Sequence, residues 1–369
     1  MNLEKLNLNL VCFSHLRWDF VFQRPQHILT RFAGIYNVIY IEEHVYVDSD
    51  EPYTMRHVAD NISVIVPQLN RLNNQENALE TVIDKIFEDL NLNGYIFWYY
   101  NPMAVAFTGN FNPLLTIYDC MDELTAFKNA PPMLRENEEI LLAKADLVFT
   151  GGKSLYEIKK DKHPHVSLFP SSIDKAHFEI ARNNPADPED QQQIPHPRLG
   201  FFGVIDERFD IELISSVAKM RPSWQFVFLG PVVKIDRNTL PDEPNIHYPG
   251  SKTYDQLPGY LAYWDIALIP FAINESTRYI SPTKTPEYLA AGKPVISTPI
   301  TDVVDPYGTN ELVHIINSPE EFIKAAELEL SLQDKGDWLH RVDDFLRYNS
   351  WDITWEEMNE LINESLVEA

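Results

Sequence analysis

The chain contains two successive series of short apolar runs, and stretches with helix-like apolar spacing lie between the runs. Each run has the length and the β-branched or aromatic content of a buried strand. Strands that alternate with helices predict a parallel sheet covered on both faces. We therefore predict an α/β protein with two Rossmann-like, doubly wound parallel-sheet domains that face each other across a cleft. In such sheets ligands bind beyond the carboxyl ends of the strands.

The two series define the expected domains. The first covers residues 1–180 and the second covers residues 198–350. Between them, residues 181–197 are polar and proline-rich without an apolar period, so we expect a linker there. The chain ends in one long amphipathic helix over residues 351–369.

Composition limits the kinds of partner. A net charge of −25 argues against nucleic acid, because phosphate contacts need clustered Lys and Arg. The only two cysteines, Cys12 and Cys120, lie in apolar runs and are expected to be reduced core residues of a cytoplasmic protein. No signal sequence or run of about 18 apolar residues is present. Any membrane contact is therefore expected to be peripheral, at the inner face.

The most informative stretch is residues 281–300, SPTKTPEYLAAGKPVISTPI. Its prolines and glycine predict a loop, a short helix and then a buried strand. Ser281, Thr283 and Lys284 stand at the helix start, where free N–H groups and the positive dipole end suit a diphosphate. Glu287 follows one turn later on the face of Lys284, where a carboxylate could accept hydrogen bonds from a ribose diol. The alternative is an ordinary capped helix with a solvated Lys–Glu pair.

The run AAGKPV, from Ala290 to Val295, is very similar to the nucleotide-sugar-binding element of GT-B glycosyltransferases of the glycosyl transferases group 1 (GT4-like) class. That pattern has a Glu, seven further residues and a second Glu. Glu287 matches the second Glu, whereas Tyr279 stands at the first. The resemblance extends at low identity over nearly the whole chain, towards bacterial enzymes of teichuronic acid and exopolysaccharide assembly. It implies that helix 351–369 joins the first domain.

The resemblance also implies which residues of the second domain bind the donor. Gly203 matches the start of a Gly-Arg…Lys segment, but Val204 stands in place of the Arg, and Arg208 lies within one residue of the family Lys. Arg208 is therefore a candidate for the diphosphate. Its alternative is an ion pair with Asp206 or Glu207.

Together these residues predict a site for the donor, in which Glu287 binds the ribose. Tyr248 lies where the family packs the nucleobase, although internal packing explains this residue equally well. The residues expected around the diphosphate are Gly203, Arg208, Ser281, Thr283 and Lys284.

Two strand ends of the first domain carry candidate catalytic groups. His15 follows the first strand, and a neutral imidazole can accept a proton near pH 7. A structural histidine is the alternative. In the resembled enzymes the loop after this strand lies over the donor sugar, so Arg17, Asp19 and Arg24 are candidates to line the cleft, with solvated surface charge as the competing interpretation.

Three carboxylates, Asp119, Asp122 and Glu123, come at the end of another apolar strand. Mutual repulsion is expected to raise the pKa of at least one of them, which would suit it to take a proton from an acceptor hydroxyl. Asp119 and Asp122 are the leading candidates for this base. The alternative is that Asp122 or Glu123 caps the next helix.

The predicted function is transfer of a sugar from a UDP- or GDP-linked donor to a hydroxyl of a glycan or lipid-linked acceptor. The resemblance implies a role in bacterial surface polysaccharide synthesis. Cations and a helix end would stabilise the leaving group, so neither a metal site nor a cofactor is expected. Two alternatives stay open, namely a nucleotide-sugar 2-epimerase of GT-B architecture and a non-catalytic GT-B-like binding scaffold.

Overall fold

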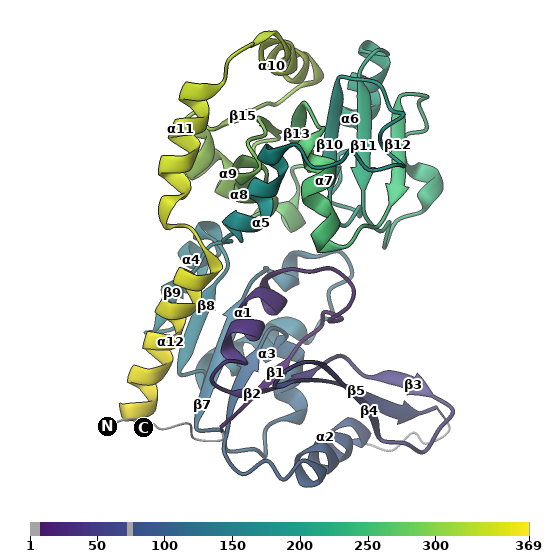
Figure 1. Ribbon diagram of the computed structural model, residues 1–369. Helices are drawn as coiled ribbons and strands as arrows, with labels where there is room; N and C mark the ends of the chain where they lie inside the picture. The colour runs from purple at the N-terminus through teal and green to yellow at the C-terminus, as the bar shows by residue number, and fades with distance from the viewer. Residues whose placement is uncertain (1–7, 72–76, 369) are drawn as a thin grey trace. The chain divides into compact units, whose positions relative to one another are not determined.

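The computed structural model describes residues 8–71 and 77–368, which form two compact units (Figure 1). The first unit runs up to Pro170 and includes the segment from Asp352 onward, and the second unit runs from Ser171 to Trp351. Both are α/β with parallel sheets, so the predicted fold class is confirmed. Within the described residues, no helix is both long and apolar enough to cross a membrane.

The first unit is built on a nine-stranded sheet in the order β3-β5-β2-β1-β6-β7-β8-β9, with β4 antiparallel to β5. All the other strand pairs in it are parallel. Its elements are β1 (Asn9–Phe13), α1 (Arg24–Phe32), β2 (Asn37–Ile41), β3 (Val45–Val47), β4 (Tyr53–Ala59), β5 (Ile62–Asn70), α2 (Ala78–Asp89), β6 (Tyr95–Tyr99), β7 (Leu115–Cys120), α3 (Leu134–Lys144), β8 (Leu147–Thr150), α4 (Lys153–Lys159) and β9 (Val166–Leu168), and α12 (Trp351–Glu368) returns to it.

The central strands of this unit are continuous apolar runs because helices cover both faces of the sheet. Every residue of β7 is buried, and so are four of the five residues of β1 and of β6. The edge strand β4 differs, since most of its residues are exposed and its sequence YTMRHVA lacks an apolar alternation. The sequence therefore contains no signal that would have predicted β4.

The second unit contains a six-stranded, wholly parallel sheet in the order β12-β11-β10-β13-β14-β15. Its elements are α5 (Lys175–Glu179), β10 (Arg198–Phe202), α6 (Ile211–Met220), β11 (Gln225–Leu229), β12 (Ile246–Gly250), α7 (Leu257–Ala262), β13 (Ile266–Ile269), α8 (Lys284–Ala290), β14 (Val295–Ser297), α9 (Thr301–Val303), β15 (Val313–Ile315), α10 (Pro319–Ser331) and α11 (Gly336–Phe345). Tyr288 anchors α8 to this sheet, because its hydroxyl oxygen accepts a hydrogen bond from the Phe202 N–H at 3.1 Å.

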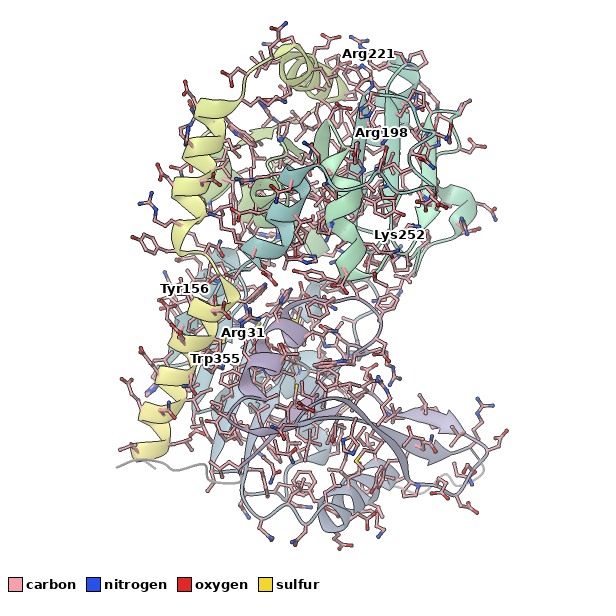
Figure 2. All side chains as sticks on the ribbon, viewed as in Figure 1. Arg31, Tyr156, Arg198, Arg221, Lys252 and Trp355 are labelled. Carbon is pink, nitrogen blue, oxygen red and sulfur yellow. The ribbon has the colours of Figure 1, made fainter. Side chains whose placement is uncertain are left out.

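Residues 181–197, expected to link two domains, lie within the second unit and pack against it. Gln191 is fully buried, and its side-chain oxygen accepts a hydrogen bond from the Trp264 indole at 2.8 Å. Arg198, which is labelled in Figure 2, pairs with Asp187 of this segment at 2.8 Å. The segment is polar because its side chains bind polar partners in the interior. Composition alone cannot show whether polar side chains bind such partners or water. The chain passes from the first unit to the second after Pro170 and returns to the first after Trp351.

Candidate functional site

The ammonium group of Lys284 lies against the backbone of Gly203. Lys284 is the first residue of α8, and Gly203 directly follows β10. A Cβ atom built on Gly203 would lie 2.3 Å from Lys284 Cε and 2.8 Å from Lys284 Nζ. Gly203 also has a φ of +134°, which side chains rarely adopt. The structure thus brings together two of the predicted donor-binding residues at the carboxyl end of β10.

The next strand of the sheet ends in the same way. Gly230 directly follows β11 and has a φ of +142°, and a Cβ on it would lie only 1.9 Å from the carbonyl oxygen of Gly203. The Gly203 N–H donates to the carbonyl oxygen of Leu229 at 2.8 Å. The two strand ends therefore touch through their backbones, which only glycine allows at these two positions.

Aromatic rings hold the Lys284 side chain. Its Nζ lies 5.5 Å from the ring centroid of Phe201 and 5.9 Å from that of Phe271. Ring faces attract a cation without carrying a formal negative charge. The Lys284 ammonium therefore lies near two aromatic rings at the edge of the sheet.

Glu287 is only 5% exposed, one turn after Lys284 on the same helix. Burial raises the pKa of Glu287 to about 8, against the opposing attraction of the Lys284 ammonium. Over residues 8–71 and 77–368 the structure gives its carboxylate no hydrogen-bond donor. A buried carboxylate with so little compensation is costly to ionise, and donors from a ligand would lower that cost.

Arg208 is engaged by a neighbouring carboxylate. Its Nε lies 2.9 and 3.2 Å from the two oxygens of Asp206, and its Nη2 lies 2.7 Å from one of them. Its carbonyl oxygen accepts a hydrogen bond from the Ala272 N–H at 2.7 Å, which places this loop beside the end of β13. The ion pair with Asp206, considered above as the alternative, is therefore present, and a diphosphate would have to compete with it.

The remaining predicted donor residues differ in how they are used. The Ser281 carbonyl oxygen accepts a hydrogen bond from Ser171 Oγ at 2.7 Å. Thr283 precedes α8, and in the described structure its side chain does not cap the helix. Tyr248, in β12, donates its hydroxyl to the carbonyl oxygen of Pro241 at 3.0 Å and packs its ring 5.7 Å from that of Phe228. Tyr248 is thus used for packing within the second unit.

In the first unit, Arg24 and Asp119 form a buried ion pair. The guanidinium of Arg24 reaches both carboxylate oxygens of Asp119 through Nε, at 3.1 and 3.0 Å, and one of them through Nη2 at 2.8 Å. Its Nη1 donates to the carbonyl oxygen of Phe169 at 2.8 Å. Asp119 is 0% exposed and Arg24 is 3% exposed. The pair therefore ties the start of α1 to β7 and to the segment that follows β9.

Two of the three carboxylates at the end of β7, Asp119 and Glu123, are paired with buried cations. Glu123 pairs at 2.8 Å with the buried Lys159, which also binds Glu138 at 2.6 Å. Burial raises the pKa of Glu123, but the Lys159 ammonium outweighs it, so this pKa is lowered. We expected a raised pKa in at least one of the three carboxylates, and Glu123 is not that residue, because α4 places Lys159 beside it. Asp122 is half-buried.

The loop after β1 is held by a carboxylate that the sequence analysis missed. Glu42, directly after β2, accepts from Arg17 Nη1 at 2.9 Å and from the Trp18 N–H at 2.8 Å. Asp19 pairs with Arg56 of β4 at 2.7 Å, on the surface. His15 is half-buried after β1. The position of Glu42 after an apolar strand was a usable signal, the same one that selected His15.

Comparison with known proteins gives two sequence matches. Residues 196–330, which include the Gly203, Lys284 and Glu287 positions, match the family model described as glycosyl transferases group 1. Over 165 residues the chain is 27% identical to the Bacillus subtilis (strain 168) glycosyltransferase TuaH, which is named for teichuronic acid biosynthesis. That match covers 43% of this chain and 41% of the length of TuaH.

Several solved structures share the fold over nearly the whole chain. Sucrose-phosphate synthase from Thermosynechococcus elongatus superimposes with a TM-score of 0.71 at 12% identity, covering 98% of this chain and 100% of that one. An E. coli trehalose-6-phosphate structure bound with UDP-2-fluoro glucose gives 0.72 at 12% identity, covering 97% and 99%. Anabaena HepE in complex with UDP gives 0.67 at 10% identity, covering 97% and 100%.

The chain therefore has the GT-B fold, and its residues 196–330 match the glycosyl transferases group 1 family model.

Proposed function

We propose that the protein is a glycosyltransferase that moves a sugar from a nucleotide diphosphate sugar, UDP- or GDP-linked, to a hydroxyl of an acceptor. The observation that carries this proposal is the placement of the Lys284 ammonium against Gly203, with the buried Glu287 one turn away. A cation and an under-compensated carboxylate side by side suit a ligand that is anionic at one end and rich in hydroxyls at the other. The match to the glycosyl transferases group 1 family supports the same conclusion.

In the proposed reaction the bond between the sugar C1 and the diphosphate oxygen breaks, and the acceptor oxygen forms a new bond to C1. The nucleoside diphosphate leaves with an additional negative charge, and the acceptor proton passes to a base. Lys284 stabilises the departing diphosphate, because a fixed cation in a partly desolvated site interacts most strongly where charge develops. Ser281, Thr283 and Arg208 are proposed as further diphosphate contacts, with Arg208 exchanging part of its pairing with Asp206.

Glu287 is proposed to bind the ribose diol. Two hydroxyl donors would stabilise its ionised form, so binding is expected to lower its pKa from about 8 and to release a proton near neutral pH. Proton release is measured by calorimetry of UDP binding in buffers of different ionisation enthalpy. A binding enthalpy independent of the buffer at pH 7 would contradict this role for Glu287.

For the base we propose Asp122 or His15, both half-buried after strands of the first unit. Asp119 was a leading candidate, but its complete burial and its bidentate pair with Arg24 leave it no route to an acceptor hydroxyl. We assign Asp119 the role of holding Arg24. Separate Asp122→Asn and His15→Gln variants identify the base, because only loss of the base lowers kcat while UDP affinity is kept.

We extend the proposal to bacterial surface polysaccharide synthesis, with a glycan or lipid-linked acceptor used at the inner face of the membrane. The name of the relative TuaH supports this extension. Incubation with donor and extracted cell-surface glycan or lipid fractions, followed by mass spectrometry, tests it. Turnover of the donor without any acceptor would instead indicate a nucleotide-sugar 2-epimerase.

The direct test of the donor site is calorimetry with UDP and GDP. Lys284→Met is expected to weaken binding by about 10- to 100-fold, since a hydrogen bond to a charged group contributes about 1.5–3 kcal/mol. The matched control is Lys219→Met, because Lys219 is a 67% exposed lysine of the same unit that pairs with Glu243. Equal affinities for the wild type and Lys284→Met would refute the proposed site. Absence of binding to any nucleotide, with native folding retained, would favour the non-catalytic scaffold.

A further inference from the structure

The loop between β13 and α8, residues 270–283, has a fixed conformation. Near its start, the Ala272 N–H donates to the carbonyl oxygen of Arg208 at 2.7 Å. Inside it, the side-chain oxygen of Asn274 accepts from the N–H groups of Ser276 and Thr277 at 3.0 and 3.2 Å. The hydroxyl of Thr277 donates back to the carbonyl oxygen of Ala272. The loop therefore leads from the carboxyl edge of the sheet to Lys284 along a defined path.

Arg278 lies on the return of this loop, six residues before Lys284, and its side chain is exposed. Its guanidinium carbon is 5.4 Å from the ring centroid of Tyr279. Among the residues that the structure describes, no carboxylate lies within ion-pair distance of it, although Glu275 is only three positions away. Among the described residues, two other arginines of the same unit, Arg237 and Arg341, also lack an ion pair, whereas the remaining ones pair with carboxylates, namely Arg182, Arg198, Arg208, Arg221 and Arg347.

Arg278 lies in an acidic part of the chain. From residue 184 onward the chain carries 14 basic and 31 acidic residues, so carboxylates are abundant in this half. Tyr279, which stacks with the guanidinium, is neutral and stands where the family pattern has Glu. The loop thus carries an exposed cation six residues before Lys284, and none of the carboxylates that the structure describes forms an ion pair with it.

We propose that Arg278 recognises a carboxylate on the transferred sugar, so that the preferred donor is a nucleotide diphosphate uronate. This inference rests on the proposed donor site, because the sugar adjoins the diphosphate that Lys284 holds. A guanidinium offers two parallel N–H donors that match the two oxygens of a carboxylate. Because the guanidinium of Arg278 already lies over the Tyr279 ring, it loses less conformational freedom when a carboxylate binds. A neutral hexose has no group that uses this charge.

Paired donors that differ only at C6 test the inference. Calorimetry compares UDP, UDP-glucose and UDP-glucuronate, and the same set is repeated with GDP, GDP-mannose and GDP-mannuronate. The wild type is expected to bind the uronate about tenfold tighter than the neutral sugar, as a charge-assisted hydrogen bond allows. Arg278→Met should remove that preference and change the affinity for the bare nucleotide by less than about twofold, and Arg278→Lys should keep part of it.

Two control variants separate the possible causes. Lys284→Met should weaken all ligands of a set by the same factor, which isolates the proposed donor site from the sugar preference. Arg237→Met removes another exposed arginine of the same unit and should leave the preference intact. A wild type that binds uronate and neutral sugar equally would overturn the inference. So would an Arg278→Met variant that loses affinity for bare UDP as strongly as for UDP-glucuronate, because Arg278 would then be a diphosphate ligand. Failure of every nucleotide to bind would refute both proposals.

Discussion

Each unit places a cation and a carboxylate at the ends of parallel strands, but the two pairs are compensated differently. In the first unit, Arg24 and Asp119 are both buried and joined by a bidentate ion pair. In the second unit, Lys284 rests on aromatic faces, and the pKa of Glu287 is raised to about 8 by burial. The first pair satisfies itself, whereas the buried Glu287 carboxylate has no hydrogen-bond donor among the residues that the structure describes, so a ligand could supply one.

This difference shows what a charged residue at a strand end indicates. A buried charge that its neighbours fully compensate stabilises the fold and has little left to offer a substrate. A buried charge with a strongly raised pKa marks incomplete compensation, which is common at functional sites. Compensation, and not residue type, therefore distinguishes the structural pair from the candidate donor site.

The largest effect is expected from removing one member of the compensated pair. Arg24→Met leaves the Asp119 carboxylate buried without its partner, which should lower the free energy of unfolding by about 3–5 kcal/mol. Urea denaturation followed by circular dichroism measures this change. The double variant Arg24→Met, Asp119→Asn should recover part of the loss, because the uncompensated charge is gone. A loss below about 1 kcal/mol in the single variant would show that the pair is not a structural element.

The next effect is the pH dependence that Glu287 creates. Its native pKa is raised to about 8, so above pH 4.5 the unfolded chain loses this proton while the native chain keeps it. The free energy of unfolding should therefore fall by several kcal/mol as the pH rises from about 4.5 to about 8, and then level off. Glu287→Gln cannot titrate and should lack this part of the slope.

Thermal unfolding at several pH values compares the wild type with Glu287→Gln. The control is Glu321→Gln, because Glu321 lies on the surface of the same unit and has a lowered pKa. The Glu321→Gln variant should therefore show the same fall in stability between pH 5 and 8 as the wild type. Saturating UDP should flatten the wild-type slope by stabilising the ionised carboxylate. Parallel profiles for the wild type and Glu287→Gln would rule out a raised pKa at this position.

The sequence predicted the fold class because apolar periodicity and strand–helix alternation are local properties. It also predicted that Lys284 and Glu287 share one helix face, because their spacing fixes this. It could not predict that Glu123 pairs with Lys159 or that Arg24 reaches Asp119, since these partners lie 36 and 95 positions apart. Nor could it reveal that residues 181–197 are polar because they pack on Trp264 and Arg198. Whether a charge is compensated depends on such distant partners. The sequence therefore indicated which strand ends carry charged residues, but not which of these residues are structural and which could bind a ligand.

The smallest effect on stability, and the most specific on binding, is expected at Gly203. Gly203→Ala places a methyl group where Lys284 Cε lies and retains a φ of +134°, whereas Gly250→Ala meets no atom within 4 Å at a φ of +85°. Both variants should lose about 1–3 kcal/mol of stability through backbone strain. Only Gly203→Ala should also displace Lys284 and weaken UDP binding by about tenfold or more, since a charge-assisted contact is lost. Calorimetry of both variants decides the matter, because equal UDP affinities would mean that the contact between Lys284 and Gly203 does not position the ammonium for a diphosphate.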